Sequence, residues 1–347
     1  MTSHLPLGLD ATYTLDPQPT GVSVYSSEIL LGLARLDPLW PVRAYYRPHR
    51  FRRAVQQPLA PNIARRVLTD WIAPAVQVFH GLNQRLPRRI RQRSVVTFHD
   101  LFVLTGEYST PDFRSRFAEF SRDAARRADL IITVSEFTAS QVSDLLNVDA
   151  SRIRVVPHGV RPPPTVPPLD YRQKMVLHVG ALQSRKNIVR LVEAFEQMPG
   201  DWRLVLAGGL GYGAEPILTR IAGSPRSHQI EITGYVTNSN LEELYRQASI
   251  LAFPSLDEGF GIPILDAMAR GVAVVTSRRS ATEEVAGEAA LLIHPNDVGE
   301  LAAALQRIAD DDDLRARLVN QGFERAKKFD WDTAVRKTRA VYKELGV

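Results

Sequence analysis

The chain of 347 residues is long enough for two domains of ordinary size, and with 44% hydrophobic residues both can hold a buried core. It contains no cysteine, which excludes disulfides, zinc–thiolate sites and thiol catalysis. Residues 1–165 carry 21 Arg and 14 Asp or Glu, a net charge of +7, whereas the remainder of the chain has a net charge of −2.

The positive charge is concentrated in two arginine-rich stretches, residues 46–55 and 85–93. Such stretches can attract anionic membranes, nucleic acids or acidic substrates, although a plain solvated surface explains them equally well. They lack regularly interleaved aromatic residues, so we expect no nucleic-acid binding. No apolar run approaches the roughly 20 residues of a membrane-spanning helix, and the N-terminus does not resemble a secretory signal. We expect a cytoplasmic protein, with peripheral contact to the inner membrane face as a separate hypothesis.

Short runs rich in Val and Ile alternate with longer amphipathic segments. The apolar runs predict strands at 76–81, 94–100, 129–135, 153–159, 175–180, 202–209, 230–236, 250–255 and 271–277. The amphipathic segments predict helices at 110–128, 240–249, 297–311 and 313–329. Apolar strands separated by helices are typical of α/β proteins whose parallel sheets are covered on both faces.

A proline-rich segment divides this pattern into two halves. Five of the eight residues 161–168 are prolines, which cannot continue a helix or a central strand and form a stiff linker. We therefore expect two doubly wound domains, residues 1–165 and 166–331. In open parallel sheets, ligands bind beyond the carboxyl ends of the strands.

Two segments of the N-terminal half are candidates for chemistry. Gly21 opens a helix whose first amides suit a phosphate or carboxylate, although a plain turn is the simpler interpretation. His99 ends the strand at 94–100, where an imidazole can exchange protons near neutral pH or donate to a substrate hydroxyl. A structural, hydrogen-bonded histidine is the alternative. His80 and His158 also follow apolar strands and compete on equal terms, and the spacing of the three supports no metal site.

In the C-terminal half, Arg185 and Lys186 follow a strand that ends at Gly180, and they precede a helix. Two cations at a helix N-terminus oppose the helix dipole and cost stability unless an anion offsets them. Diphosphate fits, because arginine offers a planar fork and lysine a point charge. The glycine-rich turn around Gly208 is only a weak indication of nucleotide binding, because it lacks the register of a dinucleotide fingerprint.

The stretch DEGFGIPILDAMARGVAVV at 257–275 places two acids, Glu258 and Asp266, around a glycine-containing turn. Pro263 suits the first position of a helix, and the glycines let backbone amides approach a ligand closely. Asp266, about one turn into that helix, is expected to face the same ligand as Glu258. Carboxylates accept hydrogen bonds from the vicinal diols of sugars and riboses, while amides hold phosphate. The stretch therefore indicates a nucleotide-sugar site.

Five segments together resemble the retaining glycosyltransferases of the GT-B fold, in the group-4 family of bacterial sugar transferases (glycosyl transferases group 1): VSEFT at 134–138, VVPHGV at 155–160, HVGALQSRKN at 178–187, TGYV at 233–236 and EGFGIPILDAMARGVAVVTS at 258–277. The stretch VTFHDL resembles the mannosyltransferase-like branch of that family. The resemblance covers essentially the whole chain. It implies two Rossmann-like domains facing across a cleft, the first binding the acceptor and the second the nucleotide-sugar donor, with a C-terminal helix at 332–347 packing back on the first.

The resemblance also implies residue roles. Glu258 would lie near the reacting carbon of the donor sugar, and Arg185 and Lys186 would neutralise the diphosphate leaving group. His99 would contact sugar hydroxyls near the reaction centre, and Asp266 would hold the ribose. The remaining donor-binding positions would cradle phosphate and sugar or read the base: Gly21, Gly208, Tyr235, Val236, Phe260, Gly261, Ile262 and Ile264.

Four positions depart from the family pattern in ways that bear on activity, and one of them is Ala273, which replaces a common proline. Asp266 stands where a glutamate is usual, and its side chain is shorter by one C–C bond of roughly 1.5 Å. Ser23 stands where a glycine is usual after Gly21, and Ala181 where many relatives have an arginine, so Arg185 would carry that charge.

The reaction expected from the resemblance moves a hexose, with mannose favoured, from a nucleoside-diphosphate sugar to a hydroxyl of a glycan or lipid-linked acceptor. GDP-mannose is the favoured donor. Fixed positive groups would take the place of a metal, so no essential divalent cation or other cofactor is expected. Two alternatives are a non-catalytic nucleotide-sugar or glycan-binding subunit and a nucleotide-sugar 2-epimerase of the same fold, which should lack the paired-acid motif.

Overall fold

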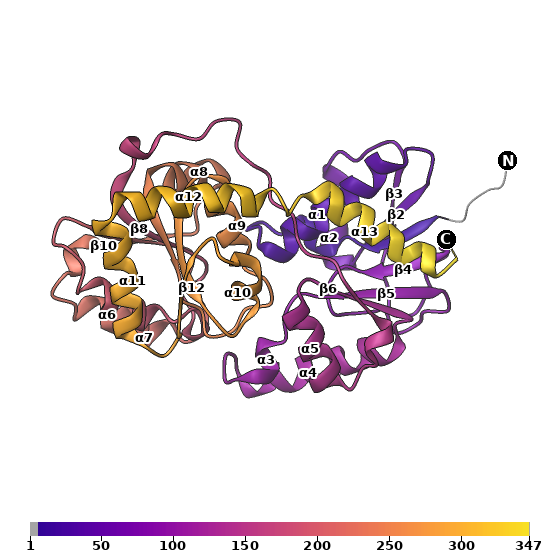
Figure 1. The fold of residues 1–347 in the computed structure, drawn as a ribbon. Coiled ribbons are helices and arrows are strands. Elements are labelled where there is room, and N and C mark those ends of the chain that lie inside the picture. Colours follow the sequence, from indigo (N-terminus) through magenta and orange to yellow (C-terminus); the bar gives the residue numbers. More distant parts are fainter. Residues whose placement is uncertain (1–5, 347) are drawn as a thin grey trace. The chain divides into compact units, whose positions relative to one another are not determined.

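The computed structural model describes residues 6–346, and the chain divides into two compact units. The first unit consists of residues 1–104, 112–159 and 330–347, and the second of residues 105–111 and 160–329. Each contains one parallel β-sheet with helices packed on it (Figure 1). The predicted α/β class with doubly wound parallel sheets is confirmed.

Within the described residues, the first unit has a seven-stranded parallel sheet in the order β3-β2-β1-β4-β5-β6-β7. The strand order reverses between β1 and β4, as in doubly wound folds. Of these strands, the last four were predicted and the first three were not. The strands are β1 (Leu7–Asp10), β2 (Val42–Tyr46), β3 (Ile63–Val67), β4 (Val78–Gly81), β5 (Arg93–Phe98), β6 (Leu130–Thr133) and β7 (Ile153–Val155).

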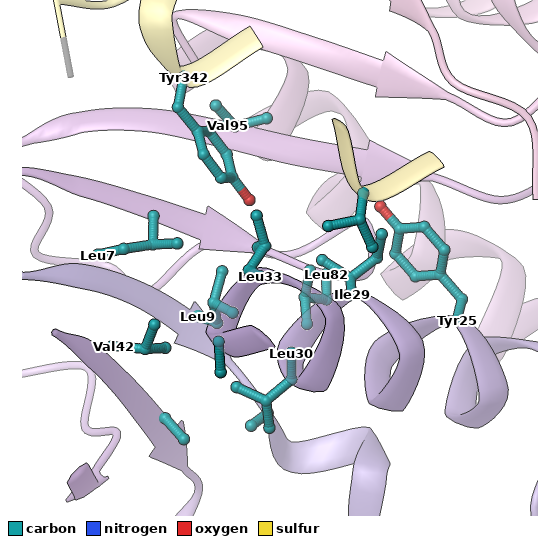
Figure 2. Close-up of a cluster of buried hydrophobic side chains, with 14 of the residues drawn as sticks. Leu7, Leu9, Tyr25, Ile29, Leu30, Leu33, Val42, Leu82, Val95 and Tyr342 are labelled. Carbon is teal, nitrogen blue, oxygen red and sulfur yellow. The ribbon is translucent and has the colours of Figure 1, made fainter. Parts of the chain in front are cut away.

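The helices of the first unit enclose a core that includes the C-terminal end of the chain. Figure 2 shows Tyr342 of the last helix reaching toward side chains of β1, β5 and α1. That helix packs against α1 at Gly32, where a Cβ would lie 2.3 Å from Val335 Cγ2. The elements are α1 (Gly21–Leu36), α2 (Pro48–Gln56), α3 (Phe102–Thr105, which ends at the boundary between the units), α4 (Pro111–Arg127), α5 (Glu136–Leu146), α13 (Trp331–Glu344), and the 3-10 helices η1 (Thr12–Leu15) and η2 (Ala150–Arg152).

The second unit, all of which the structure describes, has a six-stranded parallel sheet in the order β10-β9-β8-β11-β12-β13. Here the order reverses between β8 and β11, so the carboxyl ends of these two strands border the expected ligand site. The strands are β8 (Gln173–Val179), β9 (Arg203–Ala207), β10 (Ile230–Gly234), β11 (Ala248–Phe253), β12 (Ala273–Ser277) and β13 (Leu291–Ile293).

The apolar residues of these strands and of the flanking helices form the second core. Three of the helices, α8, α11 and α12, match the predicted segments 240–249, 297–311 and 313–329 within a few residues. The helices are α6 (Ile188–Phe195), α7 (Ala214–Ala222), α8 (Asn238–Gln247), α9 (Ile262–Ala269), α10 (Ala281–Ala286), α11 (Val298–Asp310), α12 (Asp312–Ala326), and the 3-10 helices η3 (Leu169–Tyr171), η4 (Ser184–Lys186) and η5 (Ser227–Gln229). Among the described residues, no helix is both long and apolar enough to cross a membrane.

Candidate functional site

The candidate site lies in the second unit, where β8 and β11 end. Gly180 follows β8 with φ of +144°, a backbone conformation that favours glycine. The chain then forms η4, and Asn187 adopts a left-handed conformation before α6. The Asn187 side-chain amide donates to Pro254 O at 3.0 Å and to Pro295 O at 2.6 Å. These bonds fix the loop that carries Arg185 and Lys186 beside the end of β11.

A buried ion cluster forms at this point. Glu258 Oε1 lies 2.7 Å from Arg185 Nη1 and 2.5 Å from Lys186 Nζ, and all three residues are 8% exposed. Arg185 Nη1 also donates to Asp257 O at 2.9 Å. Burial alone would raise the pKa of Glu258, but the charges of Arg185 and Lys186 outweigh it and lower this pKa to about 2. The carboxylate is therefore ionised at every physiological pH and cannot serve as a general acid.

This cluster revises the sequence argument about the two cations. The sequence predicted that a bound anion would offset the unfavourable position of the two cations beside the α6 N-terminus. In the structure, the carboxylate of Glu258 supplies the opposite charge. The three side chains still carry a net charge of +1, so the cluster continues to favour an anionic ligand. Lys186 Nζ also lies 4.5 Å from the ring centre of Phe253, a cation–π contact that holds the ammonium at the end of β11.

The turn between the two acids has the conformation that its glycine predicts. Gly261 is the N-cap of α9 with φ of +106°, and Pro263 occupies the first turn of that helix. Phe260 and Ile264 are buried beneath the turn. The Ile264 amide donates to Gly261 O at 3.0 Å, so this amide is already used within the turn. The donor-binding roles of Phe260, Gly261, Ile262 and Ile264 stay predictions.

Asp266 belongs to a different ion cluster from Glu258. Arg270 Nη1 donates to Asp266 Oδ1 at 3.0 Å, and Arg270 Nε donates to Glu242 Oε2 of α8 at 2.8 Å. Burial raises the pKa of Asp266 to about 6, although the charge of Arg270 opposes the rise. The sequence analysis named neither Arg270 nor Glu242. The spacing of four residues from Asp266 to Arg270 on one helix was the signal for the first, whereas the second is brought in from α8.

Gly208 follows β9, the neighbour of β8, and Tyr235 and Val236 follow β10, the next strand of the sheet. A Cβ on Gly208 would come within 2.0 Å of Gly180 O, so glycine is needed here for the close approach of two backbones. This packing explains Gly208 without any ligand. Tyr235 is exposed and Val236 is half-buried, directly after β10. The geometry leaves all three donor-binding roles as predictions.

His99 of the first unit is buried at the end of β5. Its Nε2 is hydrogen-bonded to Leu82 O at 2.9 Å, and because a carbonyl only accepts, Nε2 carries the proton. The ring stacks on His158 at 5.4 Å between centroids and meets the edge of Tyr25 at 4.7 Å. Burial lowers the pKa of His99 to about 4. His99 is therefore neutral near pH 7, with Nδ1 as its acceptor.

The competing histidine, His80, has a structural role. Its Nδ1 is hydrogen-bonded to Tyr342 at 2.7 Å and its Nε2 to Thr97 at 2.8 Å, and burial lowers its pKa to about 3. Both ring nitrogens are thus used inside the core. Among the described residues, no group of three His, Asp or Glu side chains is arranged to hold a metal ion.

Gly21 is the first residue of α1, and its neighbour Thr20 is the N-cap. The Ser23 hydroxyl accepts from the Thr20 amide at 3.2 Å and donates to Asp16 at 2.9 Å. The serine found in place of the usual glycine thus completes a capping box that closes the start of the helix. The role of Gly21 toward a donor phosphate stays a prediction.

Comparison with known proteins places both units in sugar-transferase families. Residues 165–325 match Glycosyl transferases group 1, and residues 21–162 match Glycosyltransferase Family 4. The chain is 34% identical to O-antigen chain mannosyltransferase B of Escherichia coli, over 77% of this chain and 74% of that protein.

A second relative and a solved structure extend the comparison. The chain is 27% identical to serotype-specific mannosyltransferase WbdA of Escherichia coli over 69% of this chain, but it spans only about a third (32%) of the length of WbdA. The fold is similar to that of a sucrose-phosphate synthase from Thermosynechococcus elongatus, with a TM-score of 0.79, 21% identity and 99% coverage of both chains.

Proposed function

Because this chain belongs to the glycosyl transferases group 1 family, and is a glycosyltransferase of GT-B fold, we propose that it transfers a hexose from a nucleoside-diphosphate sugar to a hydroxyl of a glycan or lipid-linked acceptor, with retention of configuration. Mannose is the favoured sugar and GDP-mannose the favoured donor, because relatives that the chain matches in sequence are mannosyltransferases. The single observation that supports the chemistry is the buried cluster of Arg185, Lys186 and Glu258.

This cluster fits the main difficulty of the reaction. Departure of a nucleoside diphosphate from the sugar leaves negative charge on the phosphate and an oxocarbenium-like sugar. Two cations fixed in a buried site stabilise that negative charge without reorganisation when it develops. Since Glu258 stays ionised, it suits accepting hydrogen bonds from donor-sugar hydroxyls rather than giving up a proton. In the proposed retaining mechanism the departing phosphate takes the acceptor proton.

No metal is required in this proposal, because Arg185 and Lys186 supply the positive charge at the leaving group. The first test is therefore transfer of labelled mannose from GDP-mannose, with UDP-glucose in parallel, to a mannose-terminated acceptor in the presence of EDTA. We expect transfer with an α-linked product, as read by NMR of the new anomeric proton. Loss of all transfer in EDTA with recovery on added Mg²⁺ would contradict the metal-free mechanism.

The second arm of this test removes the two cations. We expect Arg185→Ala with Lys186→Ala to lower kcat at least about 100-fold, since one lost charge-stabilising donor alone costs that much. The single variant Lys186→Met keeps Arg185 beside Glu258, so that the buried carboxylate still has a partner and a lower kcat does not reflect a folding defect. The matched control is Lys174→Ala with Arg203→Ala, two more exposed cations of the same unit. Full activity of the Arg185, Lys186 double variant would refute the assignment.

We also propose peripheral contact with an anionic membrane surface through the first unit, which would bring the enzyme to a lipid-linked acceptor. Arg52 and Arg53 are exposed on α2. Trp71 and Ile72 are 71% and 73% exposed in the segment after β3, and the Arg47–Asp70 ion pair joins that segment to the start of α2. Exposed arginines beside exposed apolar side chains suit a surface of anionic lipid head groups.

A further inference from the structure

A chain of charges runs from Asp266 through Arg270 to Glu242. One guanidinium nitrogen of Arg270, Nη1, donates to Asp266 Oδ1 at 3.0 Å and to the Asp266 carbonyl at 3.2 Å. Its Nε donates to Glu242 Oε2 at 2.8 Å. The guanidinium is thus held from both sides, by the preceding turn of its own helix and by α8.

The surroundings of Arg270 restrict it further. Its guanidinium lies 5.3 Å from the ring centre of Tyr245, a buried residue of α8. Its carbonyl accepts a hydrogen bond from Arg172. The Arg270 side chain is 14% exposed, whereas the Asp266 side chain is 26% exposed. Asp266 is therefore the more exposed member of the pair.

The arrangement leaves half of the carboxylate for a ligand. Asp266 Oδ1 is used by Arg270, while Oδ2 accepts no hydrogen bond from any residue that the structure describes. A carboxylate oxygen has two lone pairs, so Oδ2 can accept from both hydroxyls of a vicinal diol. Because a bidentate or fixed guanidinium orients its carboxylate, Oδ2 points in one direction before any ligand arrives.

We propose that Arg270 is a positioning residue for Asp266: it holds the carboxylate in one orientation beside a fixed positive charge, and Glu242 holds Arg270 in place, so that Asp266 can bind a diol of the donor. This inference rests on the proposed function, because the nucleoside-diphosphate sugar is the ligand. It also compensates for the short side chain of Asp266, because a carboxylate held in one orientation offers a diol a defined acceptor, whereas a mobile carboxylate does not.

The electrostatics give the proposal its measurable consequence. The charged and titratable groups that face Asp266 are Arg270 on its own helix and Glu242 and Tyr245 on α8. Burial raises the pKa of Asp266 to about 6, Arg270 acts against the rise, and Glu242 adds to it. Without Arg270 the pKa of Asp266 rises further, and the carboxylate is protonated closer to neutral pH.

The first experiment uses the protein without ligand. When the pKa of an acid is higher in the folded than in the unfolded state, the folded protein loses stability as the pH rises from the unfolded-state pKa through the folded-state pKa. We expect the Tm of Arg270→Gln to fall more steeply than that of the wild type between pH 5 and 8. Adding Asp266→Asn to Arg270→Gln should abolish the extra slope. Arg246→Gln, which removes an arginine paired with Glu243 on the exposed face of α8, is the control and should keep the wild-type slope.

The second experiment measures the Kd of GDP-mannose at pH 6 and pH 8, with UDP-glucose in parallel. The phosphates of such sugars are fully ionised over this range, so a pH effect reports on the protein. With the pKa of Asp266 at about 6, the wild-type Kd should be about twofold weaker at pH 6 than at pH 8. A rise of about one unit in Arg270→Gln makes the difference about tenfold, and Arg270→Lys should restore most of the wild-type profile.

The outcomes separate the two claims. Unchanged pH slopes and an unchanged Kd in Arg270→Gln, with a wild type that binds the donor, would overturn the positioning role and leave the proposed function standing. An altered Tm slope in a protein that binds neither sugar nucleotide would retain the coupling of Arg270 to Asp266 and overturn the proposed donor. Tighter donor binding by Arg270→Gln at both pH values would mean that Arg270 competes for Asp266, which refutes the proposal.

Discussion

At the scale of single residues, Glu258 links the stability of the second unit to its ligand. Its carboxylate is the negative charge on which Arg185 and Lys186 converge. We expect Glu258→Gln to cost about 3–5 kcal/mol of unfolding free energy at pH 7, as for other broken buried ion pairs. Inorganic diphosphate should restore part of the loss, because its oxygens can replace the carboxylate. The measurement is Tm with and without inorganic diphosphate, and a larger rise is expected for Glu258→Gln than for the wild type.

The pH dependence of this variant has a defined sign. The pKa of Glu258 is lowered from 4.5 to about 2, so its stabilising contribution is complete above about pH 4.5 and is lost as the pH falls toward 2. The Tm difference between wild type and Glu258→Gln should therefore shrink below pH 4.5. Glu243→Gln, at an exposed pair on α8, serves as the control. An equal rise of Tm with diphosphate in the wild type and in Glu258→Gln would contradict the idea that the carboxylate and diphosphate bind the same two cations.

At the scale of secondary-structure elements, α13 is attached to the first unit by a buried hydrogen-bond chain. Tyr342 bonds to His80, His80 to Thr97, and Thr97 to Tyr25 of α1, each at 2.7–2.8 Å. The chain joins α13, β4, β5 and α1, and Figure 2 shows Tyr25 and Tyr342 reaching into this core from two helices. Since all four side chains are buried, each lost partner leaves a polar group without water.

We expect Tyr342→Phe to cost about 1–3 kcal/mol, the usual penalty for a buried polar atom that loses its partner. Thr97→Val removes the partner of both His80 and Tyr25 and should cost at least as much. If the chain acts as a unit, the double variant will be less destabilised than the sum of the single variants in urea unfolding. Additive losses would show that the hydroxyls act independently. Tyr171→Phe, at a half-exposed tyrosine of the second unit, is the control.

The elements also show which parts of the fold a sequence can predict. The strands from β4 to β12 were found because each is a Val- and Ile-rich run between helices. The strands β1, β2, β3 and β13 were not predicted, and β3 is an edge strand whose sequence, IARRV, is largely exposed. The same limit holds at the site: Arg185, Lys186 and Glu258 follow strand ends and were recognisable, whereas the Glu242–Arg270 contact joins two helices and has no local signature.

At the scale of the whole molecule, the charge is divided unevenly along the sequence. Residues 1–165 carry a net charge of +7 and the remainder −2. An uneven division of this kind orients a protein toward an anionic surface even when the total charge, here +5, is modest. The exposed arginines of α2 and the exposed Trp71 and Ile72 give the first unit both an electrostatic and an apolar means of contact.

We expect the full chain to sediment with vesicles containing anionic phospholipid and not with vesicles of phosphatidylcholine alone. Arg66 of β3 is also exposed on the first unit. Each basic residue near an anionic surface is worth about 1 kcal/mol, so Arg52→Glu with Arg66→Glu should weaken binding at least about tenfold. Binding should weaken with salt, because the screening length shortens from about 10 Å at 0.1 M to about 3 Å at 1 M.

Two further variants separate the causes of vesicle binding. Trp71→Ala should weaken binding equally at low and high salt, because it removes apolar burial rather than charge. Arg246→Glu, on the second unit, lowers the net charge as much as Arg52→Glu does, but it should leave binding unchanged if the first unit makes the contact. An equal loss from Arg246→Glu and Arg52→Glu would mean that vesicles respond only to total charge, and the proposed membrane-facing role of the first unit would then be wrong.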